Sequence, residues 1–218
     1  MKKLIALLFL VNIAFVSCKT DKPKQQEAEV EADKTEVTMA SLEDGKYTVN
    51  PESSLLNWKG FKPTGAHNGT VAIKEGSFTI QEGSLTSGSF AFDMSTITVL
   101  DIPADDEFNG KLVGHLKSGD FFDVENFETS TFEITEVEKV GEGYKVKGNL
   151  TVKDITKPIE FAASVSSEEG VVVLKGDSFK IDRTEFDIKY KSAKFFDNLK
   201  DKFINDEFEI SFEVKASK

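Results

Sequence analysis

Residue types that perform catalysis or hold metal ions are sparse in this sequence. The two histidines, His67 and His115, lie on separate segments, and neither belongs to a motif such as HExxH. The single cysteine, Cys18, follows an N-terminal apolar run, so a zinc ion has no ligand set. No G-x-S-x-G, P-loop or G-x-G-x-x-G motif is present, which excludes the common hydrolase, nucleotide and dinucleotide sites. The sequence therefore predicts a protein that is not an enzyme and holds no metal.

The N-terminal residues 1 to 17 have the features of a signal peptide: two lysines, then an apolar stretch up to Val16 that is too short to span a bilayer. Ser17 directly before the only cysteine resembles the lipobox of bacterial lipoproteins, which implies that Cys18 is diacylated and becomes the first residue of the mature chain. An ordinary secretory signal with a chance cysteine is the alternative. Lys19 replaces the Asp typical of lipoproteins retained at the inner membrane, which favours the outer membrane, facing the periplasm.

The residues after this cysteine are dense in Lys, Glu, Gln and Asp and carry no aromatic side chain up to about Ala40. Such a composition is typical of a flexible tether. We therefore expect a signal peptide over 1–17, a lipidated cysteine with its tether over 18–44, and one folded domain over 45–218.

Composition excludes one class of partner and raises a question about the core. With 27 basic and 38 acidic residues the chain has a net charge of −11, the wrong sign for following a phosphate backbone, so no nucleic-acid partner is expected. The 23 aromatic residues include 19 Phe, which have no polar group and gain only by leaving water. That surplus of Phe must be buried.

From Tyr47 onward the dominant period of apolar residues is two, which is typical of strands with one buried face. The clearest case is the C-terminal run, where alternate residues from Phe208 to Val214 are apolar. Glycine-containing turn signals at Glu75-Gly76, Glu82-Gly83, 141–143 and 168–170 fit hairpins between consecutive antiparallel strands.

Two stretches break this alternation. Apolar residues spaced by four from Phe108 to Leu116 predict a short helix with a C-cap at Gly119. Ala193 to Phe203 is a second helical candidate. About eight to ten strands with two short helices predict an all-β fold, either a sandwich or a closed barrel whose interior is filled by side chains or holds one small ligand.

Several motifs in order along the chain resemble those of the YceI-like family. The segment from His115 to Val124, followed by Thr131-Phe132, is similar to its H-L-x-S-x-D-F-F-D-V…T-F signature. Residues 146–159 resemble V-x-G-x-L-T-[IV]-x-G-x-T-K-P-[IV], with Asp154 where Gly is common. Residues 181–186 resemble the late R-x-x-F strand, and 65–69 the early His-Gly turn.

The resemblance covers Gly45 to Ala216 and implies a fold similar to that of lipocalins, an extended antiparallel eight-stranded β-barrel whose interior holds a polyisoprenoid or another amphiphilic lipid. The tail would then contact the following inward residues: Trp58, Phe90, Phe92, Phe132, Ile134, Leu150, Val152, Phe161, Phe186, Phe208, Ile210 and Phe212. Candidates for holding its head group are His67, His115, Lys117 and Arg183. No cofactor is expected besides a bound isoprenoid lipid or quinone.

Three functional hypotheses follow. The leading one is an envelope lipoprotein, held at the membrane by its acyl anchor, that binds an amphiphilic lipid for sequestration, transport or storage. The alternative is a filled barrel that acts as an interaction module and binds another envelope protein. The third, an enzyme, requires that His115 and an acidic residue share hydrogen-bond reach at the mouth of a pocket.

Overall fold

The computed structural model describes residues 42–168 and 170–218, so the expected signal peptide, the Cys18 anchor and nearly all of the tether lie outside the described residues. The described chain contains one α-helix, α1 (Glu107–Lys117), and nine strands. The strands are β1 (Gly45–Val49), β2 (Leu55–Lys62), β3 (Gly65–Gln81), β4 (Ser84–Asp93), β5 (Thr129–Val140), β6 (Gly143–Val152), β7 (Ile155–Glu168), β8 (Val171–Asp182) and β9 (Glu207–Ser217). No helix in these two ranges is both long and apolar enough to cross a bilayer.

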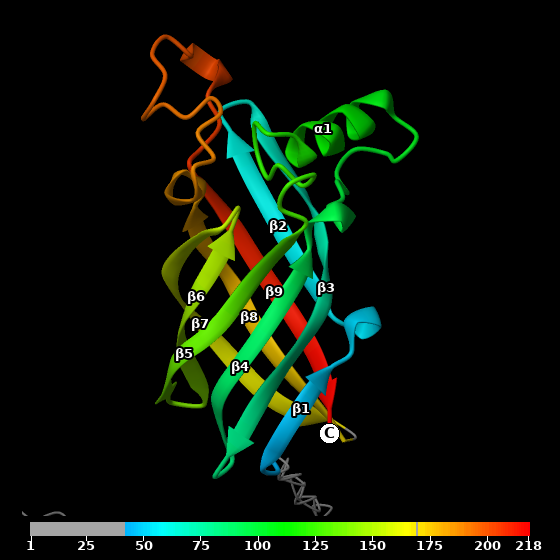
Figure 1. Ribbon diagram of the computed structural model, residues 1–218, viewed down its shortest axis with the longest axis vertical. Helices are drawn as coiled ribbons and strands as arrows, with labels where there is room; N and C mark the ends of the chain where they lie inside the picture. Colours follow the sequence, from blue (N-terminus) through cyan, green and yellow to red (C-terminus); the bar gives the residue numbers. More distant parts are fainter. Residues whose placement is uncertain (1–41, 169) are drawn as a thin grey trace, which may run out of the picture. The chain divides into compact units, whose positions relative to one another are not determined.

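The nine strands close into an antiparallel barrel with eight strand positions (Figure 1). Both β1 and β2 lie between β3 and β9, one after the other, so they share a single position. The single-turn 3-10 helix Pro51–Ser53 separates them, and Asn50 caps its start by accepting a hydrogen bond from the Glu52 N–H. The expected eight-stranded antiparallel barrel is confirmed.

Strictly antiparallel neighbours place the connections alternately at the two ends of the barrel (Figure 1). One end carries the short β3–β4, β5–β6 and β7–β8 turns together with β1, and we call it the closed end. The other end, the mouth, carries the β2–β3 and β6–β7 turns and the two long connections over 94–128 and 183–206. The helix α1 belongs to the first of these long connections.

The predicted helix near Phe108 is confirmed, but its predicted glycine cap is wrong. Asp106 caps the N-terminus by accepting a hydrogen bond from the Phe108 N–H. The helix ends at Ser118, whose backbone is extended and whose hydroxyl donates to the His115 carbonyl at 2.8 Å. A serine that satisfies a terminal carbonyl therefore stops this helix.

The second predicted helix, over Ala193 to Phe203, is wrong. This segment forms turns and one 3-10 turn at Lys200–Lys202. Asn198 and Lys200 have left-handed φ values of 61° and 52°, which interrupt any helix. Phe196 is 49% exposed, so the apolar spacing does not mark a face that packs on the core.

The glycine turn predictions hold except at Glu75-Gly76, which lies within β3. A register shift between Ile73 and Glu75 marks a bulge there. A Cβ at Gly76 would lie 2.8 Å from the Phe90 ring, so the glycine permits a close approach of the neighbouring strand. The segment 65–69, expected as a turn, likewise forms the first residues of β3.

Side chains fill the barrel at its closed end. Tyr47 stacks on Phe78 with ring centroids 5.7 Å apart, and Phe78 and Ile80 are 1% and 0% exposed. Tyr144 lies opposite Ala163 in the β6–β7 pairing, so a large side chain faces a small one. This half of the barrel is a packed core that closes the interior from one side.

Candidate functional site

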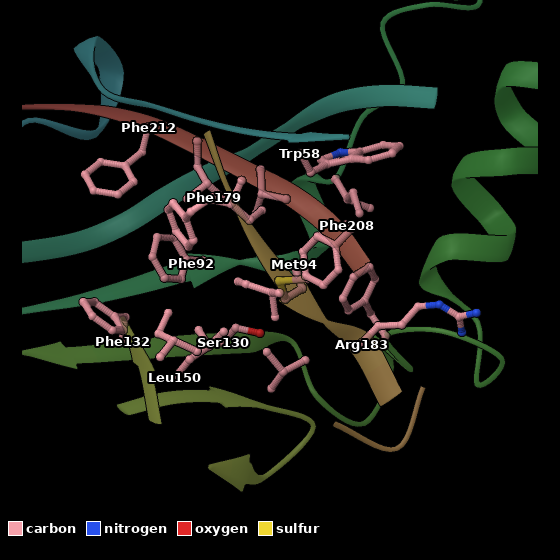
Figure 2. A pocket seen from close by; sticks show the side chains of 18 of the residues that line it. Trp58, Phe92, Met94, Ser130, Phe132, Leu150, Phe179, Arg183, Phe208 and Phe212 are labelled. Carbon is pink, nitrogen blue, oxygen red and sulfur yellow. The ribbon is translucent and has the colours of Figure 1, made fainter. Parts of the chain in front are cut away.

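The mouth half of the barrel contains an apolar cavity of about 170 Å³ (Figure 2). A cavity of roughly 150 Å³ lined by apolar groups is already sufficient for a benzene-sized ligand. Of its 31 lining residues, Ser130, Arg183 and Asn205 are the polar ones. Asn205 is exposed, so the cavity reaches the surface beside the second long connection.

The alternation of each strand determines which side chains line this cavity. On β9, Phe208, Ile210, Phe212 and Val214 face it, while the next inward residue, Ala216, belongs to the closed end. On the other strands of the barrel, too, the inward residues near the mouth line the cavity and those near the closed end do not. No residue of β1 lines the cavity. Nine of the 19 phenylalanines contribute: Phe90, Phe92, Phe121, Phe122, Phe132, Phe161, Phe179, Phe208 and Phe212.

Phe161 lies at the floor of the cavity. Its ring stacks on Phe179 at 4.6 Å between centroids, tilts against Phe132 at 5.4 Å, and meets Phe212 edge-on at 5.5 Å. The next inward residue of β7, Ala163, is buried but does not line the cavity. Phe161 is therefore the last residue of β7 that lines the cavity, next to the filled half.

Eleven of the twelve residues predicted to contact a tail line the cavity. Phe186 is the exception and was wrongly placed among them, because it does not lie in a strand. It belongs to the 3-10 turn Arg183–Phe186 that begins the second long connection, where it is 2% exposed and packs into the core outside the cavity lining. The eleven others are Trp58, Phe90, Phe92, Phe132, Ile134, Leu150, Val152, Phe161, Phe208, Ile210 and Phe212.

Trp58 is fixed in the wall of the cavity by a hydrogen bond. Its indole Nε1 donates to the Thr98 carbonyl at 3.1 Å. Thr98 in turn bonds through its N–H to the Thr70 carbonyl, which holds the start of the first long connection along β3. A Cβ at Gly69 would lie 1.8 Å from the Thr98 carbonyl oxygen, so only glycine allows this approach.

Sequence reasoning missed the cavity residues that come from the connections. Met94, Ile97, Leu116, Phe121, Phe122, Ile188 and Ile204 all line it. The adjacent pair Phe121-Phe122 follows α1 in a turn and does not lie in a strand. The sequence feature that could have identified Phe121 and Phe122 is their adjacency, because two neighbouring phenylalanines after a helix both require apolar surroundings.

Arg183 lines the cavity, but its guanidinium donates to three backbone carbonyls. The side chain is 4% exposed and donates to the carbonyls of Asn205, Ile188 and Ile204 at 3.0, 2.7 and 2.9 Å. Burial lowers the pKa of Arg183, and the nearby carboxylates of Asp206 and Asp182 oppose this shift. Figure 2 shows the guanidinium pointing away from the other labelled side chains. Arg183 therefore holds the second long connection together.

The two histidines line a second recess, between the β2–β3 hairpin and α1, with Lys62 and Lys111 beside them. His67 Nδ1 lies 2.8 Å from Asp101 Oδ2. Burial alone would raise the pKa of Asp101, but hydrogen bonds from the Asn68 N–H and from His67 outweigh it and lower that pKa. The ionised carboxylate therefore orients the His67 ring.

His115 is paired in the same manner, since its Nε2 lies 2.9 Å from Asp120 Oδ2. The ring also packs edge-on against Tyr190 and Phe121, at 4.7 and 5.1 Å. Lys117, the last residue of α1, is half-buried and does not line the recess. Of the four predicted head-group residues, the structure thus brings together His67 and His115 only.

The histidine–carboxylate pair set as the condition for an enzyme is present at the mouth. Within the described residues, however, neither imidazole is hydrogen-bonded to a hydroxyl or thiol that would serve as a nucleophile. In the same ranges no three His, Cys, Asp or Glu side chains cluster closely enough to hold a metal ion. The pair instead links the end of α1 to the turn that follows it.

The chain resembles other proteins in sequence and in fold. A protein of Serratia proteamaculans called UPF0312 protein is 35% identical over 97 residues, which are 44% of this chain and 47% of that protein, so the chain spans about half the length of the curated relative it matches. Two solved structures share the fold. BcnA of Burkholderia cenocepacia has a TM-score of 0.61 and 16% identity, covering 78% of this chain and 99% of that one. A structure described as a polyisoprenoid binding domain from Saccharophagus degradans has a TM-score of 0.55 and 12% identity, covering 78% of this chain and 97% of that one.

A family model also matches the chain. The model of the YceI-like domain matches residues 47–216, from within β1 to within β9, and so includes both long connections. This chain therefore belongs to the YceI-like family.

Proposed function

We propose that this protein binds an amphiphilic lipid with a long apolar tail, a polyisoprenoid or an isoprenoid quinone, in the cavity of the barrel. The observation that carries the proposal is an apolar cavity that ends on packed side chains at one end and reaches solvent at the other. The structural neighbour from Saccharophagus degradans, described as a polyisoprenoid binding domain, supports it. A completely filled barrel, which the interaction-module hypothesis requires, does not fit this cavity.

The cavity favours a tail through burial of apolar surface rather than through polar contacts. Each buried CH2 group stabilises a complex by about 0.8 kcal/mol, so one isoprene unit of five carbons contributes up to about 4 kcal/mol. The half-buried walls Trp58, Phe92 and Phe208 retain exposed surface that a tail would cover. The affinity for a lipid would then increase with the length of its tail, and the shape of the cavity would limit the length that fits.

For the head group, we propose the recess that contains His67 and His115. Two elements connect it with the cavity. On β2, Trp58 and Gly60 line the cavity, and Lys62, the next residue on that face, lines the recess. On α1, Leu116 lines the cavity and Leu112, one turn before it, lines the recess. A lipid whose tail fills the cavity would thus place its head beside two imidazoles and two lysines.

We also propose that the protein is an envelope lipoprotein, acylated at Cys18 and held at the outer membrane facing the periplasm, where it sequesters, transports or stores its lipid. The leader and the unique cysteine support this part. Labelling of cells with a radioactive fatty acid tests it: the wild-type protein should carry label and the Cys18→Ala variant should not.

Mass spectrometry of an organic extract of the purified protein tests lipid binding. We expect a polyisoprenoid or quinone from the wild type. Leu150→Trp, which enlarges a side chain that lines the cavity, should reduce the bound lipid, whereas Ala162→Trp, on the exposed face of β7, should not. Extracts without apolar ligand from both the wild type and the Ala162→Trp variant would refute the proposal.

A further inference from the structure

The exposed phenylalanines all lie at one end of the barrel. Among the described residues, three are largely exposed: Phe108 at 62%, and Phe195 and Phe196 at 49% each. Phe108 belongs to α1 and the other two to the second long connection, so all three lie at the mouth (Figure 1). Exposed aromatic residues gathered around an opening mark an interaction site.

Three segments at the mouth pair aromatic rings with lysines. We call these four pairs the rim. They are Lys59 with Phe61 on β2, Lys111 with Phe108 on α1, and Lys189 with Phe195 and Lys191 with Tyr190 on the second long connection, with Nζ 4.9 to 5.2 Å from the ring centroid. The pairs are contributed by three segments that are far apart in the sequence.

We propose that the rim docks on the surface of a lipid bilayer, so that the mouth of the cavity faces the membrane. An aromatic ring with an ammonium group beside it matches the boundary of a bilayer, where the ring lies at the level of the upper acyl chains and the ammonium group reaches the phosphates. A protein partner would need a surface of complementary shape, whereas a bilayer accepts separate projections from three segments.

Two of the rim lysines are not engaged in ion pairs. The chain has a net charge of −11, which repels anionic lipid, so attraction to anionic lipid depends on individual lysines that point to it. Lys59 and Lys191 form no ion pair in the part of the chain that the structure describes, although Lys111 pairs with Glu107 and Lys189 with Asp187. Lys59 and Lys191 are therefore the rim charges available to lipid phosphates.

This inference rests on the proposed function, because docking serves the transfer of a lipid into the cavity. A long apolar tail that leaves a bilayer for a distant cavity would cross water, which opposes transfer. With the rim on the membrane, the tail passes from the acyl region into the cavity directly. Docking also agrees with the proposed anchor. The tether joins β1 at the closed end, so it must reach along the barrel if the mouth faces the membrane. Fully extended, residues 18 to 42 would span roughly 80 Å, which exceeds the roughly 57 Å length of a 17-residue strand such as β3.

The test is site-specific tryptophan quenching in the full, anchored chain incorporated into vesicles that contain brominated phosphatidylcholine. Trp58 is the only native tryptophan, so Trp58→Phe provides the background. Phe195→Trp then reports on the rim, and Val140→Trp, at a 55% exposed position beside the β5–β6 turn of the closed end, is the matched control. Because the anchor is common to both variants, any difference between them reports which end contacts lipid.

We expect strong quenching and a blue-shifted emission for Phe195→Trp and neither for Val140→Trp. Adding Lys59→Gln and Lys191→Gln to the Phe195→Trp variant should reduce quenching more in vesicles that contain phosphatidylglycerol than in those without it. Equal quenching at the two positions, or none at position 195, would overturn the proposal. Lipid extracted from the wild-type protein measures the proposed function separately, because Trp58 itself lines the cavity. Lipid in the wild type without quenching at position 195 therefore rejects docking alone.

Discussion

Replacing Phe161 by alanine should deepen the cavity and shift the length of the tail that the protein prefers. The ring lies at the floor, 8% exposed, against Phe132, Phe179 and Phe212. Truncation of a buried phenylalanine costs about 3 to 5 kcal/mol, and the lower end applies because one side of this ring already faces the cavity. A tail longer by one isoprene unit would regain up to about 4 kcal/mol by filling the new space. The lipid-free variant should therefore lose about 3 kcal/mol, and the loaded variant much less.

Two measurements check this prediction. Urea unfolding of the lipid-free and loaded protein gives the two free energies, and mass spectrometry of the lipid captured from a mixture of chain lengths gives the preference. Phe78→Ala is the matched control, because Phe78 is 1% exposed in the filled end and does not line the cavity. That control should lose stability without a change in the captured length. An unchanged length distribution for Phe161→Ala would refute the assignment of this ring as the floor.

Three further substitutions test individual contacts. Arg183→Lys should lower the free energy of unfolding by about 2 to 3 kcal/mol, because an ammonium group cannot replace the guanidinium hydrogen bonds to three carbonyls; full stability with loss of lipid would instead make Arg183 a head-group ligand. Asp154→Gly should raise unfolding stability by about 0.5 kcal/mol in urea titrations, because Asp154 has a left-handed φ of 60° that glycine adopts without strain; a loss of stability would contradict this. Asp182→Asn should be less stable than the wild type by about 1 kcal/mol at neutral pH, since hydrogen bonds from Lys194 and Thr184 outweigh burial and lower the pKa of Asp182. This contribution is complete above the ordinary pKa of 3.8 and is lost as pH falls through the lowered value, so melting temperatures should converge in acid, and a gap that stays constant would show that ionisation is not involved.

The sequence predicted well those elements whose pattern is local. The alternation from Phe208 to Val214 corresponds to β9, because a two-residue period with one buried face leaves little choice of structure. The turn at Glu82-Gly83 is also where it was expected, with both residues at positive φ. The closed eight-position barrel followed from the family resemblance, since periodicity is the same for a sandwich.

Elements that depend on tertiary contacts were harder to predict. The apolar spacing over Ala193 to Phe203 imitates a helix, yet the segment is held by its ends: Arg183 bonds to the carbonyls of Ile204 and Asn205, and the Asn205 N–H bonds to the Phe61 carbonyl. No local pattern encodes such bonds. The same limit applies to the cavity residues of the connections, which point inward without any period.

The sequence pattern does not distinguish the filled half of the barrel from the hollow half. Inward residues alternate in the same way in both halves. Stacked rings occur in both halves too: Tyr47 and Phe78 are 15° from parallel at the closed end, and Phe161 and Phe179 are 16° from parallel beside the cavity. Periodicity determines the face on which a side chain lies but not its rotamer, so the same surplus of phenylalanine is compatible with a plug or with a lined tunnel until the ring orientations are known.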